Sequence, residues 1–456
     1  MTPLFCVDIT EALAEENELV IRCTDDLHDQ AFPYGKQVMN QGGMWYTPVS
    51  GIWQTVWLES VPDIYIEKLN IENHGASVTI STVPPLEGTV SVEPLGQFPL
   101  ENGQVTIAPE NPHFWCPDDP YLYRFALETA QDRVESYFAI RSLEIKKVGE
   151  YPRLCLNGKP YFFHGLLDQG YWPEGLYTPP SDAAVERELS EVKALGYNLL
   201  RKHAKIEPQR WYYHCDRLGL VVWQDMVNGG SKYNLWFVTY LTNVLQPLMR
   251  RLPDKAALWG LLSRGSESSR EEYRRELEDT VQALRCHPCV GCWVPFNEGW
   301  GQYDAAGAVQ AIRALDDTRL VDEASGWYDQ GGGDVYSLHN YFYPLRVRPQ
   351  TRTVALSEYG GIAWPMPGHE PPRKTYGYGT AKSREELTAR YKKMQLGTVL
   401  PQLQKGLSAL VYTQLTDVED EVNGLFTYDR TAIKPDANAV RSVNAALAAE
   451  FARVVK

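Results

Sequence analysis

Two kinds of chemistry-bearing residue lie close together in the stretch RCHPCVGCWVPFNEGWGQ, residues 285–302. Cys286, Cys289 and Cys292 have the CxxCxxC spacing that can hold an iron–sulfur cluster or a zinc ion. The chain then reads NEGW at residues 297–300, where a carboxylate has hydrogen-bonding and aromatic neighbours. The stretch therefore poses a choice between a metal or redox site and carboxylate chemistry.

The cysteine run fits a buried strand better than a metal site. Pro288 ends the preceding helix, because proline cannot continue one, and residues 289–296 then read as a strand. Side chains alternate between the two faces of a strand, so Cys289 and Cys292 point in different directions. A fourth ligand would also be needed, and beyond the neighbouring His287 no further CxxC pair supplies one. We interpret these cysteines as small buried hydrophobic residues.

Glu298 and Glu358 are the carboxylates whose settings best suit catalysis. Each follows an apolar run that reads as a strand, has a glycine close behind it and has aromatic residues nearby. A carboxylate at the end of an apolar strand is costly to bury unless it is paired or used. Cleavage of a glycosidic bond with retention of configuration uses two carboxyl groups about 5 to 5.5 Å apart. Two glutamates at the same end of one barrel can meet that requirement.

The elements that must position these residues follow a pattern of strand, loop and helix after about residue 150. Eight apolar or β-branched stretches read as strands. They cover residues 161–169, 198–203, 220–226, 291–298, 319–325, 334–340, 354–360 and 407–418. Eight such strands with intervening helices predict a (β/α)8 TIM barrel, in which the chemistry lies at the C-terminal ends of the strands.

Polar side chains collect at the C-terminal ends of the predicted strands, as the barrel interpretation requires. They are Asp168, Arg201, His203, Asp225, Asn297, Glu298, His339, Glu358 and Asp417. A structural salt bridge is the competing interpretation for any one of them. For Asp168 and Asp417, substrate contact and structural hydrogen bonding both stay open.

Two gaps predict an irregular barrel. Residues 326–333 and 341–353, after the fifth and sixth strands, leave little room for helices, so we expect a distortion there. In contrast, the first crossover has a clear helix start at residues 179–182 (PPSD), followed by apolar residues at helical spacing. A doubly wound sheet is the rival architecture, but residues 164–168 do not provide the glycine-rich first turn that it needs.

The composition excludes several classes of protein. The chain has 456 residues, of which 44% are hydrophobic and 22% charged, as is typical of a globular protein with several domains. The net charge is -14 without a basic block, so nucleic acid is not an expected partner. No run of about 18 apolar residues predicts a membrane span. The eight scattered cysteines favour a reducing cytoplasm over a disulfide framework.

The first third of the chain is β-rich. Short β-branched or aromatic stretches, such as residues 18–23, 53–61, 76–82 and 121–129, are separated by Pro, Gly and Asn. This pattern is typical of antiparallel sandwiches.

Seven stretches together resemble glycoside hydrolase family 2, the family of β-galactosidases, β-glucuronidases and β-mannosidases. They are GIWQTVWLE (51–59), FWCPDDPYLY (114–123), FAIR (138–141), LNGKPYFFHG (156–165), WVPFNEGWGQ (293–302), SEYGG (357–361) and TQLTDVEDEVNGLFTYDR (413–430). SEYGG alone is a weak signal, but the order of the whole set matches that of the family.

The resemblance implies a role for each matching residue. Glu298 would be the general acid/base and Glu358 the nucleophile. Asn297 would hydrogen-bond the 2-hydroxyl of the sugar, while Arg201 and Tyr341 would hold the nucleophile ionised. Further candidates for the sugar site are His203, His339, Asp225, Trp300, Trp327 and Trp364. Of these, His203 is equally well explained as a core histidine.

The resemblance also implies three domains. Residues 1–61 would form part of a sugar-binding-type jelly-roll sandwich, residues 62–146 an immunoglobulin-like β-sandwich and residues 147–456 the catalytic TIM barrel. Members of the family usually begin with a complete jelly roll, and FCVDITEAL (5–13) resembles a strand from its later half. We therefore expect about half of that sandwich to be missing, which would leave sheet edges unpaired.

The resemblance says less about the substrate. β-Glucuronidases of the family carry an Asn-x-Lys pair near the last strand, which residues 415–430 do not supply. The expected function is thus retaining, exo-acting hydrolysis of terminal β-linked neutral sugars, as in a β-galactosidase. Furanosides and arabinosides stay open, because the eighth strand reads Tyr412-Thr413-Gln414 where the family often has Trp.

The expected partner is a glycoside or oligosaccharide, with a homo-oligomer left open. No cofactor is expected, although a divalent or sodium ion stays open because some relatives bind one near the site. Two other classes of function also remain: a carbohydrate-binding or vestigial protein with impaired catalysis, and a metal or redox protein that uses the cysteine run.

Overall fold

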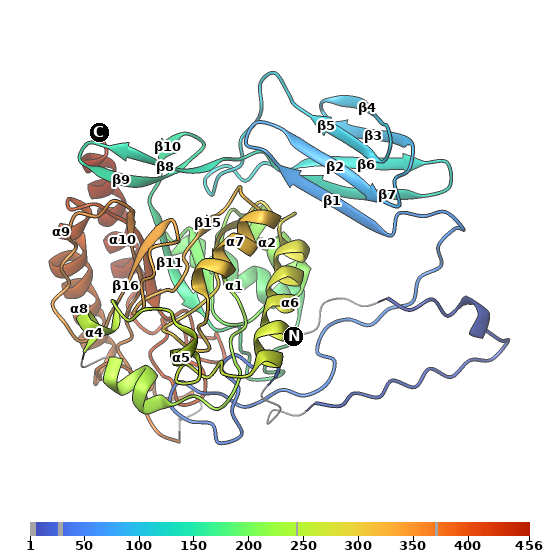
Figure 1. Ribbon diagram of the computed structural model, residues 1–456. Coiled ribbons are helices and arrows are strands. Elements are labelled where there is room, and N and C mark those ends of the chain that lie inside the picture. The colour runs from blue at the N-terminus through green and yellow to red at the C-terminus, as the bar shows by residue number, and fades with distance from the viewer. Residues whose placement is uncertain (1–5, 26–30, 243–244, 370–372) are drawn as a thin grey trace.

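The computed structural model describes residues 6–25, 31–242, 245–369 and 373–456. Within them, antiparallel sheets precede one large parallel sheet along the chain. Figure 1 shows a group of antiparallel strands at the upper right and the parallel strands with their helices at the left. The prediction of a multidomain chain that ends in a barrel is confirmed.

Two antiparallel sheets pack against each other between residues 68 and 140. Their strand orders are β1-β2-β5 and β4-β3-β6-β7. The strands are β1 (Lys68–Asn73), β2 (Val78–Val83), β3 (Gly88–Glu93), β4 (Gly96–Leu100), β5 (Gln104–Ile107), β6 (Tyr123–Thr129) and β7 (Arg133–Phe138). Alternate side chains face one shared core, for example Val78 and Ile80 of β2 opposite Phe125 and Leu127 of β6. This is a β-sandwich; its immunoglobulin-like type stays a prediction.

The described part of residues 1–61 contains no regular strand. Residues 6–25, with the short 3₁₀ helix η1 (Thr10–Ala12), run as an extended trace away from the rest of the chain (Figure 1). Residues 31–49, which we call the N-terminal arm, instead lie against the barrel. There the backbone N–H groups of Tyr34 and Gly35 donate to the Asn228 carbonyl at 3.1 and 2.6 Å. The partial jelly roll stays a prediction.

A small three-stranded sheet links the sandwich to the barrel. It has the order β10-β9-β8 and consists of β8 (Leu143–Val148), β9 (Tyr151–Leu156) and β10 (Lys159–Pro160). The buried guanidinium of Arg153 in β9 donates to the carbonyls of Leu403 and Leu407 at 2.7 Å each. These bonds fix the sheet to the segment in which the last barrel strand begins.

The barrel has eight parallel strands in the order β15-β14-β13-β12-β11-β18-β17-β16. Their bounds are β11 (Phe163–Asp168), β12 (Leu199–Lys202), β13 (Val221–Asp225), β14 (Val290–Val294), β15 (Leu320–Val321), β16 (Val335–Asn340), β17 (Thr353–Gly360) and β18 (Leu407–Thr413). Six of them lie within the predicted stretches, and β14 and β17 each begin one residue before theirs. No ladder joins β15 to β16 among the described residues, so the barrel is nearly closed.

Helices alternate with the barrel strands as predicted, except after the fifth and sixth strands, where none was expected. They are α1 (Asp182–Ala194), α2 (Gln209–Leu218), α6 (Glu267–Leu284), α7 (Ala305–Leu315), α8 (Arg384–Met394), η3 (Gln395–Val399), α9 (Leu400–Leu403) and α10 (Ala437–Val454). In α1 the Ser181 hydroxyl caps the first turn by accepting from Ala184 N at 3.2 Å. The connections at residues 322–334 and 341–352, all of them described, contain no helix, so the distortion of the barrel is confirmed.

One part of the barrel was not predicted. Between β13 and α6 the chain makes a long excursion that contains η2 (Trp236–Leu241), α4 (Gln246–Met249) and α5 (Ala256–Trp259). These helices are too short to show a helical period in the sequence. Among the helices of the described residues, none has the length and apolar character needed to cross a membrane.

Candidate active site

The predicted site residues come from neighbouring strands and converge at the C-terminal end of the barrel. Arg201 lies in β12, Asp225 ends β13, and Asn297 and Glu298 follow β14. Glu358 lies near the end of β17. Because the strands are parallel, their C-terminal ends meet at one end of the barrel. The strand order β12-β13-β14 and the pairing of β16 with β17 therefore bring these side chains together.

Glu358 has a cation and a phenol as hydrogen-bond partners. Arg201 Nη1 donates to Oε1 at 3.1 Å, and the Tyr341 hydroxyl donates to Oε2 at 2.7 Å. The Tyr341 ring is in turn stacked on Tyr378, with 3.6 Å between the ring centroids. Only 5% of Glu358 is exposed, so these partners replace the water that a surface carboxylate would have.

Arg201 organises the base of the site. Its Nε and Nη2 atoms donate to the two oxygens of Asp225 at 2.9 and 3.1 Å, and Nη2 also donates to Asn297 Oδ1 at 2.9 Å. Asp225 also contacts His203 Nδ1 at 2.5 Å. Although burial raises the pKa of Asp225, the Arg201 guanidinium and His203 hold it below its usual value. The fork of one arginine thus fixes Asp225, Asn297 and Glu358 relative to one another.

Glu298 lies in a less polar setting than Glu358. Its Oε1 is 2.7 Å from His339 Nδ1. Since Arg201 Nη1 faces His339 Nε2 at 3.3 Å, Nε2 is the acceptor and Nδ1 donates to Glu298. Burial lowers the pKa of His339 to about 3, so the ring is neutral, and burial raises the pKa of Glu298 to about 7, against the opposing charge of Lys36. A substantial fraction of Glu298 is therefore protonated at neutral pH.

The two glutamates are close enough to act on the same bond. A carboxylate oxygen of Glu298, a ring nitrogen of His339 and a carboxylate oxygen of Glu358 all lie within 4.8 Å of one another. Among the described residues, this is also the group of acidic, histidine or cysteine side chains whose geometry could hold a metal ion. That a metal is not required stays a prediction. What the arrangement offers without one is two neighbouring carboxyl groups, one bonded to His339 and the other to Arg201 and Tyr341.

Two polar donors of the site have no acceptor among the described residues. They are Asn297 Nδ2 and Trp300 Nε1, and both atoms are buried. Buried donors without partners are rare in folded proteins, so each is suited to a hydroxyl or other acceptor of a ligand. His203 also belongs to this region, because its ring lies 6.4 Å from that of Trp300 and bonds Asp225.

The two remaining predicted tryptophans lie in different apolar clusters. Trp327 lies 6.4 Å from the His339 ring, between centroids, and belongs to the same apolar cluster as Trp300. Trp364 instead packs in a separate cluster with Ile362 and Leu387. The structure therefore brings Trp327 to the site and shows Trp364 in apolar packing.

Asp168 and Asp417 both form buried ion pairs. Asp168 Oδ2 lies 2.5 Å from Lys202 Nζ, and Asp417 Oδ1 lies 2.6 Å from Lys434 Nζ. Burial raises the pKa of Asp417 to about 6 even though Lys434 opposes this shift. The structural interpretation accounts for the contacts of both carboxylates.

Three residues contribute to the site although they are not among the predicted site residues. Lys36 reaches it from the N-terminal arm, Tyr378 stacks on Tyr341, and Ser325 bonds His339 Nε2 at 3.1 Å. Ser325 ends a predicted strand, so the rule of polar strand ends applies to it as well. Lys36 and Tyr378 lie in loops without periodicity, where no such rule applies.

The cysteines at 286, 289 and 292 do not converge. Cys289 Sγ donates to the Tyr212 carbonyl and Cys292 Sγ to the Trp293 carbonyl, each at 3.6 Å. Burial raises the pKa of both thiols well above the usual value. Cys286 is half-buried against the core of the sandwich. Their packing agrees with the interpretation of buried hydrophobic residues.

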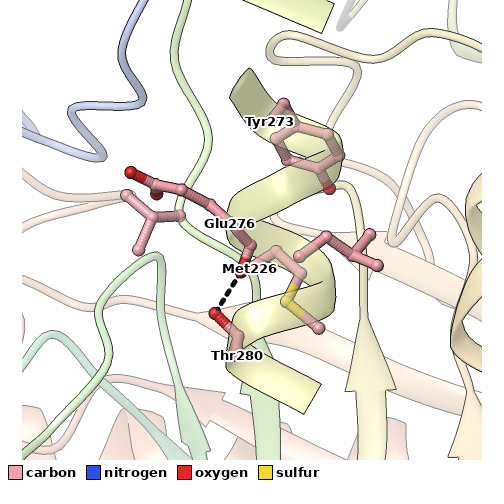
Figure 2. Close-up of a pocket in the computed structure, with 6 residues that line it drawn as sticks. Met226, Tyr273, Glu276 and Thr280 are labelled. Carbon is pink, nitrogen blue, oxygen red and sulfur yellow. Dashed lines mark hydrogen bonds between the residues drawn. The ribbon is translucent and has the colours of Figure 1, made fainter. Parts of the chain in front are cut away.

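A small pocket lies between helix α6 and the end of β13, and neither Glu298 nor Glu358 lines it. Figure 2 shows Met226, Tyr273, Glu276 and Thr280 around it, with the Thr280 hydroxyl bonded to the Glu276 carbonyl at 2.6 Å. None of these side chains is among the predicted site residues. The pocket therefore adds nothing to the case for the two predicted glutamates.

The comparisons with known proteins agree with this geometry. The family model for the TIM-barrel domain of glycosyl hydrolases family 2 matches residues 147–400. A β-galactosidase from Thermoanaerobacter pseudethanolicus is 21% identical over 404 residues, which cover 80% of this chain and 49% of that protein. A β-mannosidase B from Aspergillus clavatus is 25% identical over 256 residues, with 53% of this chain and 26% of that protein covered.

A solved structure also resembles the fold. The β-D-glucuronidase from Dictyoglomus thermophilum superposes with a TM-score of 0.63 at 16% identity, over 94% of this chain and 75% of that one. The chain spans half or less of the length of the two curated relatives above. The family model nevertheless covers more than half of this chain and includes both glutamates. The chain therefore belongs to glycoside hydrolase family 2.

Proposed function

We propose that this protein is a retaining, exo-acting β-glycosidase in which Glu358 is the nucleophile and Glu298 the general acid/base. The observation that carries the proposal is the closeness of the two carboxyl groups, with oxygens within 4.8 Å of each other. Retaining enzymes have carboxyl groups about 5 to 5.5 Å apart, whereas inverting enzymes leave about 6.5 to 9.5 Å for a water molecule.

In the first step the Glu358 carboxylate attacks the anomeric carbon from the face opposite the leaving group. Glu298 donates its proton to the glycosidic oxygen as the bond to the leaving group breaks. The products of this step are an alcohol and a glycosyl ester on Glu358. In the second step the Glu298 carboxylate takes a proton from water, whose oxygen attacks the anomeric carbon and releases Glu358 and the free sugar.

The surroundings of the two groups support this division of roles. A carboxyl group whose pKa lies near 7 can both give and take a proton near neutral pH, and burial raises the pKa of Glu298 to about 7. Glu358 accepts from Arg201 and Tyr341, which orient its oxygens. The free Asn297 Nδ2 is available to the sugar hydroxyl next to the anomeric carbon.

The sugar itself is a separate question. The names of the relatives point to three kinds of substrate, namely galactosides, mannosides and glucuronides. The absence of an Asn-x-Lys pair in residues 415–430 favours a neutral sugar.

The test is the activity of Glu358→Gln together with the anomer that the wild type releases. Wild-type protein should hydrolyse aryl β-glycosides, and NMR should show the β-anomer of the sugar before mutarotation. Glu358→Gln should lose about 10⁴-fold or more in kcat, in the range found when other hydrolases lose their nucleophile. Glu323→Gln is the control, because Glu323 is buried in the same barrel but bonds the loop backbone at Gln330 and Gly332.

Release of the α-anomer, or undiminished turnover by Glu358→Gln, would contradict the proposal. Sugar binding without turnover by the wild type would favour a carbohydrate-binding function.

A further inference from the structure

A lysine of the N-terminal arm is buried next to the proposed acid/base. Only 6% of Lys36 is exposed. Its Nζ lies 4.5 Å from the centroid of the Trp300 ring and 5.7 Å from that of Trp45. Trp300 follows Glu298 by two residues, so the ammonium group is held at the side of the site where Glu298 acts.

Lys36 differs from the other buried lysines in having no carboxylate partner. Lys202 lies 2.5 Å from Asp168, Lys205 lies 2.8 Å from Glu207 and Lys434 lies 2.6 Å from Asp417. No salt bridge or hydrogen bond of the Lys36 ammonium is found within the described part of the chain. Aromatic faces attract a cation but do not neutralise its charge. The Lys36 ammonium is therefore available to an anionic group that a ligand brings.

The nearby carboxylates do not fill this role. Glu298 interacts with Lys36 through charge, but its own proton is needed for catalysis, and its closest contact is His339. Glu421 accepts hydrogen bonds from the Tyr46 hydroxyl and from Asn423 Nδ2 at 3.0 Å.

A second observation points to a ligand in the same place. The indole Nε1 of Trp300, the ring over which Lys36 lies, is buried and has no acceptor among the described residues. An ammonium group and a free indole N–H are therefore neighbours, and both lack an acceptor. A group with several negatively charged oxygens would satisfy both.

We infer that Lys36, with Trp300 beside it, binds an anionic substituent of the glycoside, either the carboxylate of a sugar acid or a sulfate ester. The inference rests on the proposed function and names the class of substrate for the same site. It competes with the neutral sugar predicted from the missing Asn-x-Lys pair. That prediction considers only a cation near the last strand, whereas Lys36 reaches the site from a distant part of the sequence.

The test compares glycosides that differ only in charge. We would measure kcat/KM for the 4-nitrophenyl β-glucuronide against the β-glucoside, the β-galacturonide against the β-galactoside, and the β-galactoside 6-sulfate against the β-galactoside. The wild type should prefer at least one anionic member. Lys36→Gln should lower kcat/KM for that substrate by about 10- to 100-fold, the value of one charge-assisted hydrogen bond. At a pH well below the pKa of Glu298, where the protonation of Glu298 is the same in both proteins, it should change kcat/KM for the neutral substrate by less than about threefold.

Two variants serve as controls. Lys36→Arg keeps the charge and should retain part of the preference. Lys405→Gln removes an exposed lysine outside the site and should retain the full preference for the anionic glycoside. Preference for a uronide over the sulfate, or the reverse, identifies which of the two anions is recognised.

The inference is overturned if the wild type shows no preference for any anionic member, which requires no variant at all. It is also overturned if Lys36→Gln lowers kcat/KM equally for the anionic and the neutral glycoside of a pair. If the wild type hydrolyses none of the glycosides, the proposed function fails, and the inference is decided by calorimetry with glucuronate, galacturonate and galactose 6-sulfate. Binding that Lys36→Gln abolishes supports it, and absence of binding by all three overturns it.

Discussion

At the scale of single residues, the two glutamates differ in what surrounds them although both are buried. Glu358 accepts from Arg201 and Tyr341, while the contact of Glu298 is the neutral ring of His339. Burial alone would penalise charge on both. The Arg201 guanidinium donates to Glu358 and not to Glu298, and this difference supports the proposed roles of nucleophile for Glu358 and general acid for Glu298.

The raised pKa of Glu298 predicts the pH dependence of activity. If Glu298 is the proton donor, as proposed, kcat/KM should be maintained below about pH 7 and fall as the pH rises through the value of about 7 to which burial raises the pKa of Glu298. Lys36 opposes that shift, so Lys36→Gln should move the basic limb to higher pH. The pH profile of kcat/KM is measured on a neutral aryl glycoside for the wild type and for Lys36→Gln. Lys405→Gln, which changes an exposed lysine, is the control and should leave the profile unchanged. A limb that stays in place or moves to lower pH contradicts this prediction.

At the scale of elements, the strands could be predicted and several contacts between loops could not. Parallel barrel strands are buried on both faces, so each reads as a continuous apolar run that ends in a polar residue. Arg201, Asp225 and Glu358 were found in this way. Helix α1 was found from the Ser181 cap and its apolar spacing.

The loop contributors could not be found by such rules. Lys36 and Tyr378 lie in segments without a repeating pattern, and they reach Trp300 and Tyr341 only after the chain has folded. Trp364, another predicted site residue, packs in an apolar cluster with Ile362 and Leu387, and its role in the site stays a prediction.

The ion pair between Lys434 and Asp417 makes a prediction for the segment after β18. Lys434→Met leaves the Asp417 carboxylate buried without its cation, at a cost of about 3 to 5 kcal/mol in the free energy of unfolding. The double variant Lys434→Met/Asp417→Asn also removes the charge and should recover part of that loss. Denaturant unfolding measures both. Equal stability of the single and double variants would show that the pair does not hold this segment.

At the scale of the whole molecule, parts outside the barrel support the site. Arg141, just after the sandwich, donates to the carbonyls of Pro288 and Val290 at 2.8 and 2.7 Å, where strand β14 begins. The N-terminal arm lies at the opposite end of that strand and brings Lys36 and Trp45 to Trp300. The barrel therefore relies on segments far apart in the sequence.

The contact between the N-terminal arm and the barrel can be tested by substituting a glycine of the arm. Gly35 has φ +63° and a Cβ added there would lie 2.7 Å from the Ala204 carbonyl, whereas Gly51 has φ +89° and open space around it. Both substitutions to Ala place a side chain in the left-handed region, at about 1 kcal/mol each. Only Gly35→Ala also pushes the arm from the barrel, so it should lower kcat/KM by about tenfold or more while Gly51→Ala changes it little. Equal kcat/KM in the two variants contradicts the role of the arm.

The assignment of nucleophile and acid/base is the central claim, and rescue by azide tests it most directly. In Glu358→Ala, azide takes the place of the nucleophile and attacks the substrate itself, so the product should be the α-glycosyl azide. In Glu298→Ala, azide should instead attack the glycosyl ester on Glu358 and give the β-glycosyl azide. With an aryl β-glycoside that the wild type hydrolyses, NMR distinguishes the two products. The opposite pairing of products and variants, or the same anomer from both, would contradict the assignment.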